Sequence, residues 1–249
     1  MIILNSADKV KFNFKTVITI GNFDGVHVGH KLLINQTRDL AKKLNAKSLV
    51  FCFWPNTKKI LCDSRFKCIC DKYERRLIIK NLGIDYLFEF DFDDKKKNMR
   101  SKDFLDMLIK NFNCIGLVLG EDYKFGCDDS QRILCDYKNL NVQVIKKQWG
   151  ISSSYIRNLI LKKNFFLANK MLCENYFILK RNAEINNKKL VFEVCEDKLL
   201  PPDGIHKTKI LLENSFYICK TEIINQKKII ARMFSSPDNL KFGSAKIIF

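Results

Sequence analysis

The alternation of short β-rich runs with longer helical segments constrains the fold of this chain more than any other feature. Up to about residue 175, five runs rich in β-branched and aromatic residues recur, at 16–20, 48–53, 85–90, 115–120 and 142–146. Segments with helical periodicity separate them; Leu33, Leu40 and Leu44, for example, share one helix face. This order predicts an α/β fold with a doubly wound, five-stranded parallel sheet. Such sheets bind ligands beyond the carboxyl ends of their strands.

Two further helices have recognisable ends. The segment 72–83 finishes on Gly83, which is a common helix stop. The segment 101–112 begins at Ser101, and we expect this serine to be the N-cap because its hydroxyl can accept a hydrogen bond from a free amide of the first turn.

After about residue 176 the pattern changes to segments in which apolar and polar residues alternate, joined by short turns. This pattern is typical of antiparallel strands and predicts a small antiparallel β-barrel. We therefore expect two domains, residues 1–178 and 179–249.

Composition excludes some classes of protein and leaves others open. The formal charge of +17 raises the hypothesis of nucleic-acid binding, but lysines and arginines are spread along the whole chain, which disfavours a nucleic-acid partner. No apolar run approaches the roughly 18–20 residues of a membrane span. The amino terminus lacks the basic-then-apolar order of a signal peptide. We expect a cytoplasmic protein without a membrane partner, and the pattern assigns no oligomeric state.

The first strand-to-helix connection, GNFDGVHVGH, contains two of the three histidines of the chain, His27 and His30. Its place predicts a helix amino terminus at the carboxyl edge of the sheet, where backbone N–H groups hold anions. Gly21, Gly25 and Gly29 permit tight turning and close approach. If His27 opens the helix, both rings lie on one side and can donate hydrogen bonds to a phosphoryl group as charge builds up on it.

Other interpretations of this stretch are open. Two histidines three residues apart can ligate zinc, but no third ligand follows at a suitable spacing, so we expect no protein metal site. The pair can also be purely structural. The stretch matches neither G-x-x-x-x-G-K-[ST] nor G-x-G-x-x-G, so a Walker site and a dinucleotide fold are not supported.

A second candidate element, GISSSYIRNLI at 150–160, follows the fifth strand. Its serines predict an N-cap. Ser153 and Arg157 are i, i+4 neighbours, which brings a permanently charged guanidinium beside hydroxyl and amide donors. We interpret this as a second phosphate-binding helix start.

Together, GNFDGVHVGH and ISSSYIR resemble the HxGH and ISSTxxR signatures of the nucleotidylyltransferase superfamily. The form G-x-F-D-G-x-H-x-G-H resembles the bacterial FAD synthetase family, the bifunctional riboflavin kinases/FMN adenylyltransferases. FCFWPN at 51–56 resembles the F-x-P-H-P segment of that family, and GEDYKFG at 120–126 resembles its G-x-D-F-x-F-G segment. The likeness covers about residues 14–178.

The resemblance implies transfer of AMP from ATP to FMN, giving FAD and pyrophosphate, by in-line attack of the FMN phosphate on the ATP α-phosphorus. It implies ATP and FMN as substrates and Mg²⁺ as a partner of ATP. The implied catalytic residues are His27, His30 and Arg157. The implied ATP-binding residues are Gly21, Asn22, Phe23, Asp24, Gly29, Ser152 and Ser153. The implied flavin-binding residues are Phe53, Pro55, Asn56, Asp122, Tyr123 and Phe125.

The chain departs from the family most clearly in its second domain. LLPPDGIHKTKILL at 199–212 resembles a strand of the family's kinase barrel, and we expect His206 to be an ordinary strand residue. The glycine-rich G-x-x-L-G-F-P-T-A-N segment is absent, however, and residues 186–198 stand in its place. A barrel without that loop has little with which to hold a triphosphate. We therefore expect a riboflavin-kinase-like barrel that has lost kinase activity.

Two alternative functions stay open. One is an HxGH nucleotidylyltransferase that acts on another phosphorylated substrate. The other, of a different class, is a catalytically silent, basic pseudoenzyme that binds nucleic acid.

Overall fold

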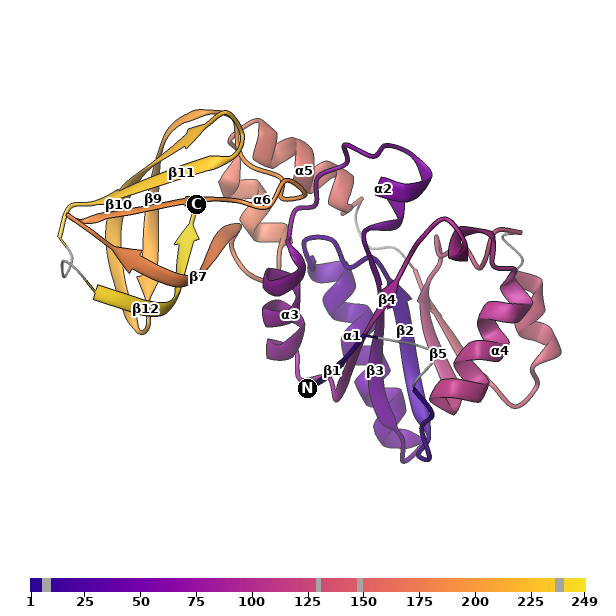
Figure 1. Ribbon diagram of the computed structural model, residues 1–249. Helices are drawn as coiled ribbons and strands as arrows, with labels where there is room; N and C mark the ends of the chain where they lie inside the picture. Colours follow the sequence, from indigo (N-terminus) through magenta and orange to yellow (C-terminus); the bar gives the residue numbers. More distant parts are fainter. Residues whose placement is uncertain (6–9, 129–130, 147–149, 236–239) are drawn as a thin grey trace. The chain divides into compact units, whose positions relative to one another are not determined.

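The computed structural model describes residues 1–5, 10–128, 131–146, 150–235 and 240–249, which form two compact units (Figure 1). Unit 1 consists of residues 1–66 and 76–151, and unit 2 of residues 67–75 and 152–249. The units divide near residue 151, whereas the predicted boundary at residue 178 follows the change of sequence pattern and stays a prediction. Each unit is described by itself below.

Unit 1 is built on a parallel sheet of six strands in the order β1-β4-β3-β2-β5-β6. All five predicted strands are confirmed within a residue or two: β2 (Thr16–Gly21), β3 (Lys47–Trp54), β4 (Tyr86–Asp91), β5 (Cys114–Gly120) and β6 (Asn141–Ile145). The sixth strand, β1 (Ile2–Leu4), pairs with β4 at the edge of the sheet. Three residues are too few for a detectable period, so the sequence did not predict it.

The strand order fixes where a ligand can bind. From β2 the chain continues to β3 and β4 on one side, and then returns to place β5 and β6 on the other side. The direction of winding therefore reverses between β2 and β5, which pair side by side. In open α/β sheets, the crevice beyond the carboxyl ends of the strands at such a switch point is the usual ligand site.

Both faces of this sheet are covered. Val17 packs with Leu40 and Ala41 of α1 (Val28–Lys43). The next residue, Ile18, points to the opposite face and belongs to a cluster with Leu105 and Leu108 of α4 (Ser101–Phe112). Because successive strand residues alternate between faces, this confirms a doubly wound sheet with helices on both sides.

The predicted capping role of Ser101 is wrong. Arg100 occupies the N-cap of α4, and Ser101 is the first helical residue and is fully buried. Its hydroxyl bonds to the Phe125 carbonyl at 2.7 Å and to Asp128. A tertiary contact therefore explains this serine better than local capping. Three further short helices belong to unit 1: α2 (Thr57–Leu61), η2 (Lys96–Asn98) and η3 (Gln131–Asp136). Helix α3 (Lys72–Asn81) contributes its first residues to unit 2 and the others to unit 1.

Unit 2 contains α5 (Ser153–Leu161), α6 (Phe165–Met171) and an antiparallel sheet of six strands in the order β7-β12-β9-β10-β11-β8. The strands are β7 (Phe177–Ile185), β8 (Lys189–Glu193), β9 (Gly204–Leu212), β10 (Ser215–Ile224), β11 (Lys228–Met233) and β12 (Leu240–Ile248). The end strands of this order, β7 and β8, are consecutive in the chain, and Asn186 and Lys189 exchange backbone hydrogen bonds of 3.0 Å between them. The sheet is therefore a nearly closed barrel, as predicted.

His206 lies on β9, where its Nε2 is 2.9 Å from the Pro202 carbonyl oxygen, so its interpretation as a strand residue is confirmed. Within the described part of the chain, no helix combines the length and the apolar character that crossing a membrane would require.

Candidate functional site

The loop between β2 and α1 has a constrained backbone. Phe23 and Val26 adopt positive φ angles of 49° and 39°, and Gly25 lies between them at 79°. A β-branched residue such as Val26 rarely adopts this conformation, and both non-glycine side chains are fully buried. Such a loop persists only where the surrounding structure fixes it, and strained backbone of this kind concentrates at functional sites.

The two histidines open α1, as predicted. His27 is the N-cap and His30 the third helical residue, and their rings stack with centroids 3.8 Å apart at 20°. The backbone N–H of His27 donates to Nδ1 of His30 at 3.3 Å. This hydrogen bond requires an unprotonated Nδ1, so we assign the proton of His30 to Nε2.

The electrostatics of the pair favour a neutral His30. Burial, and secondly the neighbouring His27, hold the pKa of His30 well below its ordinary value of 6.5. At neutral pH, His30 is therefore an uncharged donor through Nε2. The amides of the first turn of α1 have no carbonyl partner within the helix, so ring and backbone donors occur at the same helix end.

Steric crowding explains why glycine, and no larger residue, stands between the histidines at position 29. A Cβ added to Gly29 would lie 3.1 Å from Cε1 and 3.2 Å from Nδ1 of the His27 ring. Similarly, a Cβ on Gly21 would lie 3.3 Å from the ring of Phe23, and that ring lies 5.1 Å from the ring of His30. Both glycines therefore leave space for the rings that position the histidine pair.

Hydrogen bonds tie this loop to the connection after β3. Asn22 donates through Nδ2 to the hydroxyl of Thr57 at 2.8 Å and accepts from the Thr57 amide at 2.9 Å. Asn56 is buried and caps α2, because its side chain accepts from the Lys58 amide. Pro55 follows a cis peptide bond. Thr57 was not among the predicted site residues; nothing in its local sequence indicates a partner 35 residues away.

Asp24, one of the predicted ATP-binding residues, is buried in the same loop. Among the residues that the structure describes, no group of three or more His, Cys, Asp and Glu side chains is arranged to hold a metal ion.

The loop after β5 carries the predicted residues Asp122, Tyr123 and Phe125. Asp122 is exposed and Tyr123 is half-buried, whereas Phe125 is fully enclosed and packs edge-on against Phe104 at 5.8 Å. The ring centroids of Tyr123 and Phe125 lie 5.1 Å apart. Tyr123 is therefore the ring that reaches the surface.

Phe53 belongs to the buried core beneath the loop after β5. It is almost fully buried and stacks with Phe104 at 6.2 Å in the aromatic core. Together with Phe125, it supports the surface at Tyr123 from inside the unit.

Gly126 ends this loop in a place that only glycine can occupy. Its φ is +61°, and a Cβ would lie 2.3 Å from the backbone nitrogen of Ser101. The Cys127 amide bonds to the Met99 carbonyl at 3.0 Å, and the Ser101 amide bonds to Asp128 at 2.8 Å. The sequence reasoning missed these contacts, because they depend on how closely the loop approaches the start of α4.

The start of α5 belongs to unit 2. Ser152 is its N-cap and accepts from the Tyr155 amide at 3.1 Å, so the capping prediction is confirmed. Ser153 and Arg157 lie one turn apart on the helix, and both are half-buried. Arg157 donates through Nη1 to the Lys67 carbonyl, also in unit 2. This hydrogen bond fixes one end of the guanidinium.

Residues 186–198 of the barrel do not form an open loop. They consist of a tight turn, strand β8 and a short segment fixed by backbone bonds: the Val194 amide donates to Lys227, and the Lys198 amide to Cys195. Lys198 is fully buried, and its Nζ donates to the Ile69 carbonyl at 2.6 Å, the Phe177 carbonyl at 2.9 Å and Glu74 at 2.5 Å. Burial opposes the charged form of Lys198, but the interactions around it, that with the Glu74 carboxylate first among them, together outweigh this effect and raise its pKa.

Comparison with known proteins gives one family. A family model described as FAD synthetase matches residues 9–152. A bifunctional riboflavin kinase/FMN adenylyltransferase from Buchnera aphidicola subsp. Schizaphis graminum is 25% identical over 88% of this chain and 73% of its own length. A protein of the same name from Bacillus subtilis is 26% identical over 82% of this chain and 70% of its own.

A protein named FAD synthetase, from Listeria monocytogenes, is 27% identical over 77% of this chain and 80% of its own length. Among solved structures, one reported as a macrolide-efflux protein from Streptococcus pneumoniae matches with a TM-score of 0.85 at 22% identity. It covers 100% of this chain and 89% of that one. At that identity the likeness establishes the fold alone.

Proposed function

Because the chain belongs to the FAD synthetase family, we propose that it transfers AMP from ATP to FMN, giving FAD and pyrophosphate. The observation that carries this proposal is the stacked pair of His27 and His30 at the amino terminus of α1. The pair follows β2, one of the two strands that flank the switch point of the sheet, where ligands of this fold class bind.

In the proposed reaction, an oxygen of the FMN phosphate attacks the α-phosphorus of ATP in line with the departing group. A P–O bond forms to the FMN phosphate, the bond between the α-phosphorus and the bridging oxygen breaks, and pyrophosphate leaves with that electron pair. The FMN phosphate is already ionised at neutral pH, so neither a covalent nucleophile nor a general base is required. Positioning and charge stabilisation carry the rate.

His30 suits this task in its neutral form. With Nδ1 occupied by the His27 amide, its Nε2–H donates to the phosphoryl oxygens as negative charge grows in the transition state. His27 and the first amides of α1 add donors at the same helix end. The neutral imidazole keeps one N–H group, so His30 needs no positive charge to act as a donor.

We assign the triphosphate and the departing pyrophosphate to Ser152, Ser153 and Arg157, and the ATP pocket to Gly21, Asn22, Phe23, Asp24 and Gly29. These assignments rest on the motifs. Mg²⁺ is proposed as a partner of ATP that takes its ligands largely from the substrate phosphates.

On the flavin side, we propose that Tyr123 covers the ring system, with Asp122 and Pro55 beside it. Asn56 acts through the cap of α2, and Phe53 and Phe125 act as the buried support of that surface. An aromatic wall of this kind supports a planar apolar ligand.

We also propose that the barrel has lost riboflavin kinase activity. The segment at the place of the family's glycine-rich loop uses its amides within the fold, at Val194 and Lys198, and sends the Lys198 ammonium into the interior. A triphosphate needs free backbone donors in a glycine-rich loop, and this segment has no glycine and forms a strand of the barrel instead.

An assay with two substrates tests both proposals. The purified chain is incubated with ATP and Mg²⁺, with FMN in one tube and riboflavin in the other, and the flavins are resolved by chromatography. We expect FAD from FMN and unchanged riboflavin. FMN or FAD from riboflavin would overturn the loss of kinase activity. Absence of FAD from FMN would overturn the adenylyl transfer in favour of another phosphorylated substrate or a silent enzyme.

A further inference from the structure

The outer face of the barrel carries a row of four basic side chains from four adjacent strands. Lys207 of β9 is directly opposite Lys220 of β10. Lys220 is opposite Arg232 of β11, and Arg232 is opposite Lys189 of β8. All four residues are exposed. With strands about 4.8 Å apart, the row spans about 14 Å.

This register is unfavourable for folding alone. Like charges directly opposite each other in a sheet destabilise it. Arg232 has a counter-charge, since its Nη1 donates to Glu222 at 2.9 Å, but Lys220 stands between two positive neighbours. A polyanionic ligand would turn this repulsion into attraction.

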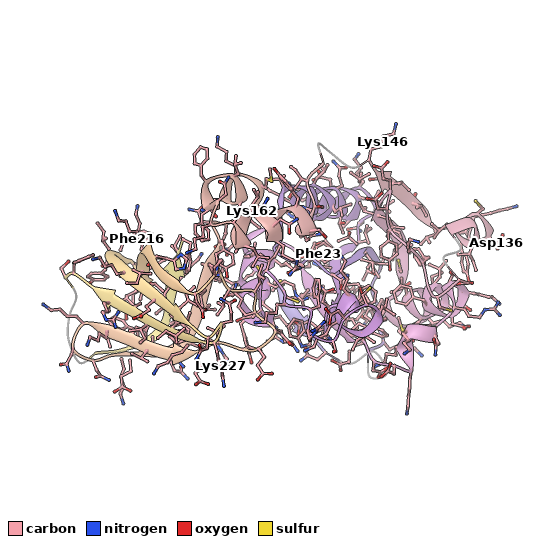
Figure 2. All side chains as sticks on the ribbon, turned by 90° about the horizontal axis from the view of Figure 1, so that it is seen from above. Phe23, Asp136, Lys146, Lys162, Phe216 and Lys227 are labelled. Carbon is pink, nitrogen blue, oxygen red and sulfur yellow. The ribbon has the colours of Figure 1, made fainter. Side chains whose placement is uncertain are left out.

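Next to the basic row lie three of the most exposed apolar side chains of the described chain. Phe216, Ile218 and Phe234 are 63%, 65% and 63% exposed. Phe216 and Ile218 are two residues apart on β10 and both face outward. The Phe234 amide extends the β10–β11 pairing by donating to the Ile218 carbonyl at 3.2 Å. Phe216 lies on the outer surface of the barrel in Figure 2. Lys220 also approaches the ring of Phe234, at 5.9 Å.

We propose that this face, the basic platform of Lys189, Lys207, Lys220, Arg232, Phe216, Ile218 and Phe234, binds single-stranded nucleic acid. The basic row contacts the phosphates, and Phe216 and Phe234 stack against unpaired bases, as in other platforms that combine aromatic rings with positive charge. A duplex does not expose base faces for stacking. On a membrane, the apolar groups would have to project beyond the charges, whereas here both kinds of residue share one sheet surface.

Fluorescence anisotropy tests the proposal on the full chain, with labelled 20-mers of uridine, of thymidine and of duplex DNA between about 50 and 200 mM salt. We expect both single strands to bind more tightly than the duplex. A logarithmic salt slope approaching −3 is expected for four phosphate contacts, at about −0.7 per contact.

Two double variants and two matched controls localise the binding. Lys207→Gln with Lys220→Gln should reduce the salt slope by about 1.4, whereas Lys42→Gln with Lys43→Gln removes the same charge from α1 and should leave it unchanged. Phe216→Ala with Phe234→Ala should weaken binding at least about ten-fold. Phe166→Ala removes an equally exposed ring from α6 and should have less than a two-fold effect.

A stability measurement tests whether the charge of Lys220 serves binding at a cost to folding. Lys220→Gln relieves two like-charge contacts, so the melting temperature of the barrel should rise by about 2 °C while single-strand binding weakens. Absence of single-strand binding, equal losses in the control variants, or tighter binding of duplex would each overturn the proposal. Platform-dependent binding to phosphatidylserine vesicles without binding to oligonucleotides would overturn it in favour of a membrane surface. FAD formation is unaffected in every variant, so the outcome is independent of the proposed reaction.

Discussion

The loop between β2 and α1, which we propose as a phosphate site, and the barrel segment 186–198, which we propose has lost one, use their backbone in opposite ways. The first keeps glycine at position 29, where a Cβ would crowd the His27 ring, and leads into a helix turn whose first amides have no carbonyl partner within the helix, although the His30 amide bonds to the His27 side chain. The second uses its amides in a hairpin and turns its one buried cation inward. A phosphate site therefore requires backbone N–H donors and space that the secondary structure does not already occupy.

The largest effect is expected from removing the buried cation of the barrel. Lys198→Met leaves Glu74 buried without its charge partner and should destabilise unit 2 by about 3–5 kcal/mol, measured by urea unfolding. Lys227→Ala, which breaks the exposed pair with Glu193 on the same barrel (Lys227 is labelled in Figure 2), should leave stability unchanged. If Lys198→Met also gains riboflavin kinase activity, segment 186–198 still contains a phosphate site that Lys198 blocks, and the site has not been lost.

The next effect concerns the histidine pair. His30→Ala removes a positioned donor and should lower kcat for FAD formation by about 10²–10³ with little change in stability. His206→Gln changes the third histidine of the chain, on β9, and serves as the matched control with unchanged kcat per folded molecule. Equal losses in the two variants would contradict a specific role for His30.

Gly126 tests a loop that serves the fold. Gly126→Ala places a methyl group against the Ser101 backbone and should cost about 2–4 kcal/mol. Gly150→Ala has a similar positive φ of 63° but no atom within 4 Å of the added Cβ, so it should cost only about 1–2 kcal/mol. Equal costs would show that φ alone, without the steric contact, explains the glycine at position 126.

The next prediction tests whether Gly29 is needed for activity and not for stability. Gly29→Ala should lower kcat about ten-fold, because the methyl group displaces the His27 ring by a few tenths of an ångström. Stability should not fall, since alanine favours a helix over glycine by about 1 kcal/mol. Gly243→Ala, with open space around the added Cβ, is the control for activity. A loss of stability without a loss of activity would reverse our assignment of this glycine.

The sequence predicted those features that depend on local pattern. The five longer strands of the sheet, the barrel and the helix start at His27 follow from periods and motifs within a few residues. The missed features depend on distance in the chain: Lys198 reaches Glu74 across 124 residues, and Ser101 bonds to Phe125 across 24. No local period reports such contacts. Strand β1 was missed for another reason, because three residues are shorter than any detectable pattern.

The smallest expected effect is a pH dependence of stability. The pKa of His30 is held well below its ordinary value of 6.5, so between the lowered value and 6.5 the unfolded chain binds more protons than the folded protein. The contribution of His30 to stability should therefore fall as the pH decreases from about 6.5. Burial raises the pKa of Glu74 to about 7, which acts in the opposite direction, so urea unfolding at pH 7.5, 6.5 and 5.5 is compared between the unchanged chain and its variants. In His30→Gln the loss should be smaller. His206→Gln should change it less, because the hydrogen bond to Pro202 opposes the lowering of the His206 pKa by burial. If His206→Gln reduces the pH dependence of stability more than His30→Gln does, then His206 is the histidine whose lowered pKa controls it. Our assignment of a neutral His30 at the start of α1 would then be wrong.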